Sequence, residues 1–229
     1  MRTAAILPVK RFTRAKQRLG ASVAAELRAD LARAMVADVL AALDETPSIA
    51  RTIVVTCESS VAVAACSLGA LIVQDTVEES QSAAVALGVE RALAEGFERA
   101  LCVPGDCPAL DPAELDSLLS APGATAADRP EVVIVPDRHG TGTNGLLLTP
   151  PDVIAPSFGP GSSARHLALA REAEATSRIE RPASLLLDVD TGADLAALRE
   201  RLAGAHGRAP RTRMVLGLTA RDVPIAHAG

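Results

Sequence analysis

The chain has 229 residues, a formal net charge of −5 at pH 7, 48% hydrophobic residues and only 1% aromatic residues. It is long enough for one large domain with an aliphatic core. Its acidic net charge argues against non-specific DNA binding. Its small number of aromatic residues argues against binding of single-stranded nucleic acid, in which bases stack on aromatic rings. No stretch of about 18 apolar residues is free of charge, and the first 20 residues are too polar for a secretion signal. We therefore expect a cytoplasmic protein with no membrane span, and reduced cysteines that serve as small core residues.

Strand-like and helix-like segments alternate along the chain. Short apolar or β-branched runs predict strands at 4–9, 52–56, 70–74, 100–103, 132–135, 146–149 and 185–189. Helical spacing of apolar residues predicts helices at 22–43, 59–68, 80–95, 112–120, 162–175 and 192–202. Continuous apolar strands separated by helices indicate an α/β domain, residues 1–203, with a largely parallel sheet covered on both faces. Residues 204–229 lack clear periodicity, and we expect a C-terminal tail that is partly disordered, with order around 214–218.

A basic loop follows the first predicted strand. Its positive charges lie between residues 10 and 18 and come from Lys10, Arg11, Arg14, Lys16 and Arg18. Parallel sheets bind ligands beyond the C-terminal ends of their strands, and a following helix N-terminus adds backbone amides. This loop therefore suits a polyphosphate, with a solvated basic surface as the alternative.

Carboxylates occur at the ends of two later predicted strands. Asp106 follows the strand at 100–103, and Asp188 and Asp190 lie at the end of the strand at 185–189. Side chains at i and i+2 of a strand share a face, so these two charges repel unless a cation holds them. Mg²⁺ prefers one or two carboxylates together with phosphate oxygens, and two such ions would make a two-metal phosphoryl-transfer site. The alternative is that Asp106 caps a turn, that Asp190 caps the next helix and that Asp188 is exposed.

Two glycine-rich segments can approach an anionic ligand closely. The first covers residues 137–145 and includes Thr143 and Asn144. The second runs from 158 to 163 and opens a predicted helix with Gly161, Ser162 and Ser163, a start that suits a carboxylate or a phosphate. His166 in this helix is more typical of a packed or capping histidine than of a catalyst.

These segments together resemble a known enzyme family. LPVKRFTRAKQRL at 7–19, GTGTNGLLL at 140–148 and FGPGSSARH at 158–166 carry most of the resemblance, supported by PGDCP at 104–108 and DVDT at 188–191. The family guanylylates 2-phospho-L-lactate, phosphoenolpyruvate or 3-phospho-D-glycerate in the biosynthesis of the deazaflavin coenzyme F-420. The resemblance implies a three-layer Rossmann-like nucleotidyltransferase fold whose mostly parallel sheet is mixed, so that at least one strand is antiparallel.

The resemblance also implies roles for individual residues. Lys10 and Lys16 would contact the GTP phosphates, and Asp106, a catalytic residue with them, would hold Mg²⁺ together with Asp188 and Asp190. The acceptor pocket would be lined by Thr143, Asn144, Gly161, Ser162 and Ser163. One stretch departs from the family: residues 80–82 read Ser-Gln-Ser where a Gly-Leu-Asn-like sequence is usual, which leaves the guanine preference open.

The expected reaction is transfer of GMP from GTP to a small phosphorylated acid with release of pyrophosphate. The product would then pass to the next enzyme of coenzyme F-420 biosynthesis. One alternative is a nucleotidyltransferase with another phosphorylated acceptor, such as molybdopterin or a sugar phosphate. Another is a non-catalytic nucleotide-binding module on the same fold. The short acceptor loops weigh against the first, and the presence of all three carboxylates weighs against the second.

Overall fold

A mixed sheet organises the molecule. The computed structural model describes residues 1–12, 24–121, 129–203 and 208–218. In the described chain the sheet has the order β3-β2-β1-β4-β6-β5-β7. The strands are β1 (Thr3–Val9), β2 (Ile49–Thr56), β3 (Leu71–Val73), β4 (Arg99–Cys102), β5 (Glu131–Pro136), β6 (Thr143–Thr149) and β7 (Thr176–Ile179). Strand β6 is antiparallel to both of its neighbours and the other pairs are parallel, so the prediction of a mostly parallel mixed sheet is confirmed.

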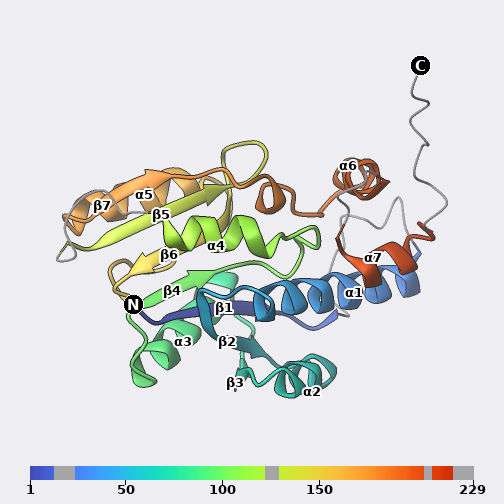
Figure 1. Cartoon of the computed structure of the whole chain (residues 1–229), viewed down its shortest axis with the longest axis horizontal. Coiled ribbons are helices and arrows are strands. Elements are labelled where there is room, and N and C mark those ends of the chain that lie inside the picture. Colours follow the sequence, from blue (N-terminus) through green and yellow to red (C-terminus); the bar gives the residue numbers. More distant parts are fainter. Residues whose placement is uncertain (13–23, 122–128, 204–207, 219–229) are drawn as a thin grey trace.

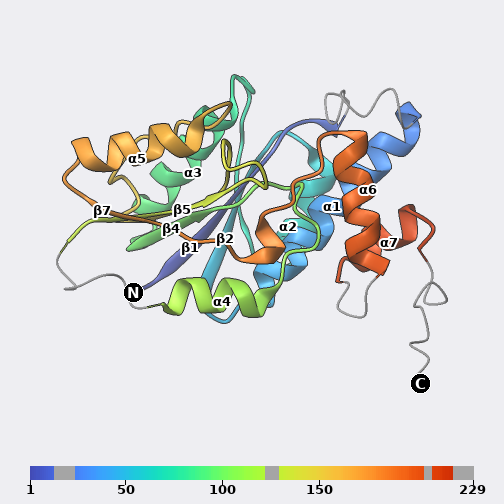
Figure 2. The same cartoon turned by 90° about the horizontal axis from the view of Figure 1, so that it is seen from above.

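Helices cover both faces of this sheet, which confirms the predicted three layers (Figures 1 and 2). The helices are α1 (Ala25–Asp44), α2 (Ser59–Ser67), α3 (Gln81–Ala94), α4 (Pro112–Ser120), α5 (Ser162–Glu172), α6 (Gly192–Ala203) and α7 (Pro210–Val215). Alternation along β1 shows how the layers form. Leu7 and Val9 join the core beneath α1, α2 and α4, whereas Ala4 and Ile6 join the core beneath α3 and α5.

A third apolar cluster lies outside the sheet, where α6 and α7 pack beside α1 (Figure 2). Leu31 and Met35 of α1 meet side chains of α6, of α7 and of the segment that precedes α6. The described residues after 207 are therefore packed against the domain, and α7 overlaps the order that we expected around 214–218. The division of the chain at residue 203 stays a prediction.

The predicted strand at 185–189 is wrong. Ala183–Leu185 forms a 3₁₀ turn, and residues 186–190 run on without joining the sheet. The apolar side chains of this segment are buried by packing, with Leu187 and Val189 in the cluster beneath α6, and not by strand pairing. The last strand of the sheet, beside β5, is instead β7, a short edge strand of half-buried and exposed residues that lacks the apolar signal of a central strand.

The cysteines are free thiols, as expected. Cys102 and Cys107 are buried, and burial raises the pKa of Cys102 to about 12. Cys66 is exposed, so the expectation that every cysteine serves the core is wrong for this residue. No helix in the described ranges has both the length and the apolar character needed to cross a membrane.

Helix α7 depends on a buried carboxylate of α1. Asp38 is 4% exposed, and its oxygens accept hydrogen bonds from the backbone amides of Arg211 (3.2 Å) and Thr212 (2.8 Å) at the start of α7. Asp38→Ala removes this cap and leaves two amides without an acceptor. We expect it to lower the free energy of unfolding by about 2 kcal/mol, as measured by urea denaturation. Asp30→Ala, on the exposed side of the same helix, should change stability by less than about 0.5 kcal/mol. Equal effects of the two substitutions would contradict the capping role.

Candidate active site

A cavity of about 620 Å³ opens at the edge of the sheet where β1, β3 and β4 end and where the reversed strand β6 begins. It brings together most of the site residues predicted from the sequence, namely Lys10, Asp106, Thr143, Asn144, Ser162, Asp188 and Asp190. Gly161 and Ser163 adjoin this set in the chain but do not line the cavity, so their contact with a ligand stays a prediction. Lys16 lies outside the described residues.

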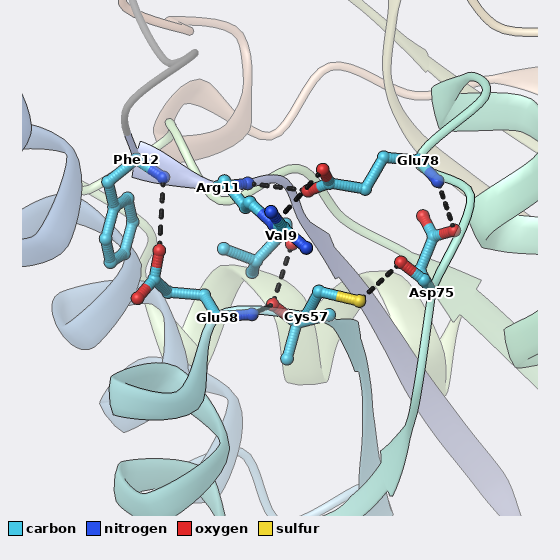
Figure 3. Close-up of polar contacts among 8 residues, drawn as sticks. Val9, Arg11, Phe12, Cys57, Glu58, Asp75 and Glu78 are labelled. Carbon is cyan, nitrogen blue, oxygen red and sulfur yellow. Dashed lines mark hydrogen bonds and ion pairs between the residues drawn. The ribbon is translucent and has the colours of Figure 1, made fainter.

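The first residues of the basic loop are held by carboxylates from neighbouring loops (Figure 3). Glu78 accepts the backbone amide of Arg11 at 3.0 Å and pairs with its guanidinium at 3.4 Å, while Glu58 accepts the amide of Phe12 at 3.3 Å. The charge of Arg11 is therefore already neutralised by Glu78. Lys10 is exposed and lines the cavity, so it is the cation of this described stretch that can meet a phosphate.

The three predicted metal-binding carboxylates line the same cavity. The backbone amide of Val189 donates to the carbonyl of Asp106 at 3.1 Å, which sets the two loops side by side. Burial raises the pKa of Asp188, and the nearby charge of Asp106 raises it further, as does that of Asp190. Burial and the two neighbouring carboxylates therefore all disfavour the charged form of Asp188, while the hydrogen bond from Asn144 favours it. No group of three or more His, Cys, Asp or Glu side chains in the described chain is arranged to hold a metal ion, so the three-residue Mg²⁺ site stays a prediction.

A capping box at the start of α6 rules out the alternative role for Asp190. The carboxylate of Asp194 accepts the amide of Thr191 at 2.7 Å, and the amide of Asp194 donates to the Thr191 hydroxyl at 3.3 Å. Burial acts to raise the pKa of Asp194, but hydrogen bonds from the Thr191 side chain and backbone, the amide of Asp190 and the charge of Arg138 together lower it. The helix is thus capped by Thr191 and Asp194. The amide of Asp190 donates to Asp194 at 3.1 Å, and Asp190 is among the residues that line the cavity.

His166 organises the opposite wall of the cavity. The ring is fully buried, and its Nε2 accepts the amide of Ser157 at 3.0 Å. Burial lowers the pKa of His166 to about 4, so the neutral ring carries its proton on Nδ1 and donates to the Thr143 hydroxyl at 3.1 Å. The Ser162 hydroxyl also donates to Thr143, at 2.9 Å. Thr143 therefore accepts two hydrogen bonds, and its own proton is left to donate into the cavity that it lines.

The start of α5 is less open to anions than the sequence suggests. The amide of Ser162 donates to the carbonyl of Gly159 at 3.0 Å, and the amide of Ser163 donates to the carbonyl of Thr141 at 3.2 Å. These helix amides are therefore already satisfied. Gly161 has a φ of +73°, a left-handed conformation that glycine adopts without strain, so its role in the described structure is conformational.

Two residues of β6, Asn144 and Gly145, shape the part of the cavity that holds the carboxylates. The Asn144 amide donates to Asp188 at 3.1 Å, which orients this carboxylate. Gly145 follows, and a Cβ there would lie 2.7 Å from the Leu185 side chain and 3.0 Å from the Cβ of Val135, so a larger residue would force these side chains to shift.

The sequence interpretation missed Asp75, which lines the cavity, and gave no individual role to Gln81, Asp137 and Thr141, which line it within segments that the sequence had singled out. Asp137 closes the turn between β5 and β6 by accepting the amide of Thr141 at 2.9 Å. Asp75 lies two residues after the end of β3, so the inspection of polar residues after strands, which identified Asp106, would also have identified Asp75.

Comparison with known proteins agrees with this architecture. Residues 3–217 match the family model for guanylyl transferases described as CofC like. A phosphoenolpyruvate guanylyltransferase of Conexibacter woesei is 50% identical over 98% of this chain and 99% of its own length. A 2-phospho-L-lactate guanylyltransferase of Methanothermobacter thermautotrophicus is 34% identical over 91% of this chain and 89% of its own.

Solved structures show the fold. A crystal structure described as a nucleotide-diphospho-sugar transferase of Desulfovibrio desulfuricans G20 superposes with a TM-score of 0.73 and 17% identity, covering 97% of both chains. At this identity the likeness concerns the fold alone. It confirms the predicted nucleotidyltransferase architecture.

The buried neutral His166 predicts a pH dependence of stability. Its pKa is about 4 in the folded protein and 6.5 in an unfolded chain, so the unfolded state binds more protons between these values. The stability that comes from neutral His166 is therefore complete above pH 6.5 and is lost as the pH falls toward 4. We expect His166→Gln to reduce the loss of unfolding free energy between pH 7 and pH 4.5 by about 2 kcal/mol.

The measurement is urea denaturation at both pH values for the wild type, His166→Gln and His139→Gln. The last variant replaces an exposed histidine and should follow the wild type. If His166→Gln lost as much unfolding free energy as the wild type between pH 7 and pH 4.5, the assignment of a neutral buried ring would be contradicted.

Proposed function

The chain belongs to the CofC-like family of guanylyl transferases, and we propose that it transfers GMP from GTP to phosphoenolpyruvate with release of pyrophosphate. The observation that carries the proposal is a cavity with Lys10 on one side, a group of carboxylates in the middle and the Thr143 hydroxyl on the other side. Such a cavity can receive a polyphosphate beside Lys10, a metal ion at the carboxylates and a small anionic acceptor beside Thr143. The choice of acceptor is supported by the 50% identity to a relative that is named for phosphoenolpyruvate.

The donor set of the cavity fits Mg²⁺. Asp106 and Asp188 are close enough for the charge of one to raise the pKa of the other, so a bound cation would relieve their repulsion. Mg²⁺ needs only one or two carboxylates when phosphate oxygens and water complete its shell, so the lack of a three-residue ligand group among the described residues does not count against it. Asp106 and Asp188 would hold the ion, with Asp190 beside them. When bound, it would neutralise charge on the phosphates.

The chemistry asks mainly for positioning. An oxygen of the acceptor phosphate attacks the α-phosphorus of GTP, a new P–O bond forms, and the bond to the β-phosphate oxygen breaks so that pyrophosphate leaves. The acceptor phosphate is already ionised at pH 7, so no strong general base is required. Lys10 would stabilise negative charge on the GTP phosphates, and the Thr143 proton would orient the acceptor. His166 would act through Thr143 by fixing the direction of that proton.

The same reasoning extends to the setting of the reaction. We propose that the enzyme acts in the cytoplasm in coenzyme F-420 biosynthesis, because the product joins a guanosine diphosphate to a small acid and is an activated intermediate. A following enzyme would displace GMP from it. The basis for this placement is the family resemblance together with the chemistry of the product.

An acceptor panel tests the proposed function. The protein is incubated with GTP, Mg²⁺ and one of phosphoenolpyruvate, 2-phospho-L-lactate, 3-phospho-D-glycerate, molybdopterin or a sugar phosphate. Pyrophosphate release and product mass are then recorded. We expect the largest kcat/KM with phosphoenolpyruvate. Greater turnover with another small acid would reassign the acceptor, and no pyrophosphate with any acceptor would favour a non-catalytic nucleotide-binding module.

Asp188→Asn tests the metal assignment. We expect it to lower kcat by at least about a hundredfold, near 3 kcal/mol of transition-state stabilisation, and to raise the Mg²⁺ concentration needed for half-maximal rate. Because burial and the charges of Asp106 and Asp190 raise the pKa of Asp188, removing its charge should leave the melting temperature unchanged or higher. Asp152→Asn, at an exposed position outside the cavity, is the matched control. Unchanged rates and unchanged Mg²⁺ dependence in Asp188→Asn would refute the assignment.

A further inference from the structure

One buried carboxylate of the cavity is not used by phosphate transfer. Asp75 lies two residues after the end of β3, is 6% exposed and lines the cavity together with Pro8, Gln81 and Ala84. A buried carboxylate is costly unless hydrogen bonds compensate it. Its position therefore calls for a partner.

Neighbouring groups hold Asp75 in a fixed orientation (Figure 3). Its Oδ1 accepts the amide of Glu78 at 2.8 Å, and its backbone carbonyl accepts the thiol of Cys57. Its second oxygen, Oδ2, meets no hydrogen-bond donor in the described part of the chain. One oxygen thus fixes the loop, and the other remains able to accept a hydrogen bond from a ligand.

The order of the strands shows which part of the substrate reaches Asp75. Along the sheet, Asp75 follows β3, Lys10 follows β1, Asp106 follows β4 and Thr143 begins β6. With strands about 4.8 Å apart, β3 and β6 are separated by roughly 19 Å. If the phosphates meet Lys10 and the acceptor meets Thr143, the nucleoside extends toward Asp75. The cavity walls also include Pro8 and Ala84, apolar side chains that suit the face of a purine ring.

We propose that Asp75 recognises the base of the nucleotide by accepting the N1–H and 2-amino hydrogens of guanine. These two donors lie side by side on guanine, and a carboxylate has lone pairs for both in addition to the Glu78 amide. Adenine presents an unprotonated N1 at the same place, so its lone pair would face a negative charge. The selection of guanine thus includes a repulsive element against ATP. This inference rests on the proposed function, because it takes GTP as the donor.

Asp75→Asn is a sharp test because it keeps the oxygen that accepts the Glu78 amide and replaces the other oxygen with a donor. The amide of Asn matches xanthine, which has N1–H but carries a carbonyl in place of the 2-amino group. We expect Asp75→Asn to lower kcat/KM and affinity for GTP by about ten- to a hundredfold, the range expected for hydrogen bonds to a charged group. Affinity for XTP should rise, so that the GTP to XTP ratio falls at least a hundredfold. The wild type should prefer GTP to ITP, which lacks the 2-amino group, by about tenfold or more.

A matched control is Glu58→Gln. Glu58 also holds the start of the basic loop, through the Phe12 amide, but it does not line the cavity, so its substitution should leave the ranking of GTP, ITP and XTP unchanged. A role of Asp75 limited to holding its loop predicts equal losses for all three nucleotides in Asp75→Asn. That outcome would overturn the proposal.

Two readouts separate this inference from the proposed function. Calorimetric titration of GTP, ITP and XTP without an acceptor measures base recognition, and pyrophosphate release measures transfer. Suppose that titration shows the expected shift from GTP toward XTP in Asp75→Asn, but the wild type releases no pyrophosphate. That result would sustain the role of Asp75 and refute the proposed function. Pyrophosphate release with an unchanged nucleotide ranking would do the reverse. If circular dichroism shows Asp75→Asn unfolded, the wild type decides: equal affinity for GTP and ITP overturns the role of Asp75, and a preference for GTP sustains it.

Discussion

The contact between residues 187–190 and the loop after β4 is the constraint on which the rest of the site depends. It consists of one backbone hydrogen bond, from Val189 to the carbonyl of Asp106, and of apolar packing of Leu187 and Val189 behind it. Leu187 and Val189 alternate with Asp188 and Asp190 along the chain. Burial of the two apolar side chains therefore places the two aspartates at the cavity. The energy of the apolar cluster thus offsets the cost of placing carboxylates side by side.

The reversal of β6 determines what faces those carboxylates. In an all-parallel sheet the first residues of a strand lie at the edge opposite to the ligand. Since β6 runs antiparallel between β4 and β5, its first residues, Thr143 and Asn144, lie at the edge where β4 ends. Asn144 then orients Asp188, and Thr143 receives the hydrogen bond of a histidine whose burial keeps it neutral. One antiparallel strand therefore connects the acceptor side to the metal side.

The sequence predicted most of the fold because apolar runs and helical periods are local signals. It also predicted the carboxylates and the Thr143 segment as parts of the site. For Asp188 the reasoning was wrong, because residues 186–190 form an extended segment outside the sheet. A run of leucines has the same apolar pattern in a buried strand and in such a buried segment. The edge strand β7 was missed because its side chains are not apolar. The occupied amides of Ser162 and Ser163 and the paired state of Arg11 depend on partners distant in sequence, which no local pattern encodes.

The distribution of charge along the cavity supports the proposed placement of the base, the phosphates, the metal ion and the acceptor. Among the described residues that line it, Asp75, Asp106, Asp137, Asp188 and Asp190 face one cation, Lys10. In this described lining, negative charge exceeds positive charge, so we expect the affinity for a nucleoside triphosphate to draw on groups that each match one part of the substrate. A cation would satisfy the central carboxylates and the phosphates at once, and Asp137 is already satisfied by its own turn. Asp75 is the acid that a metal at the centre would not serve, because β3 lies three strands away from β4. Its charge is best matched by the donors of a base, which is why the end of the cavity far from the reaction carries a carboxylate at all.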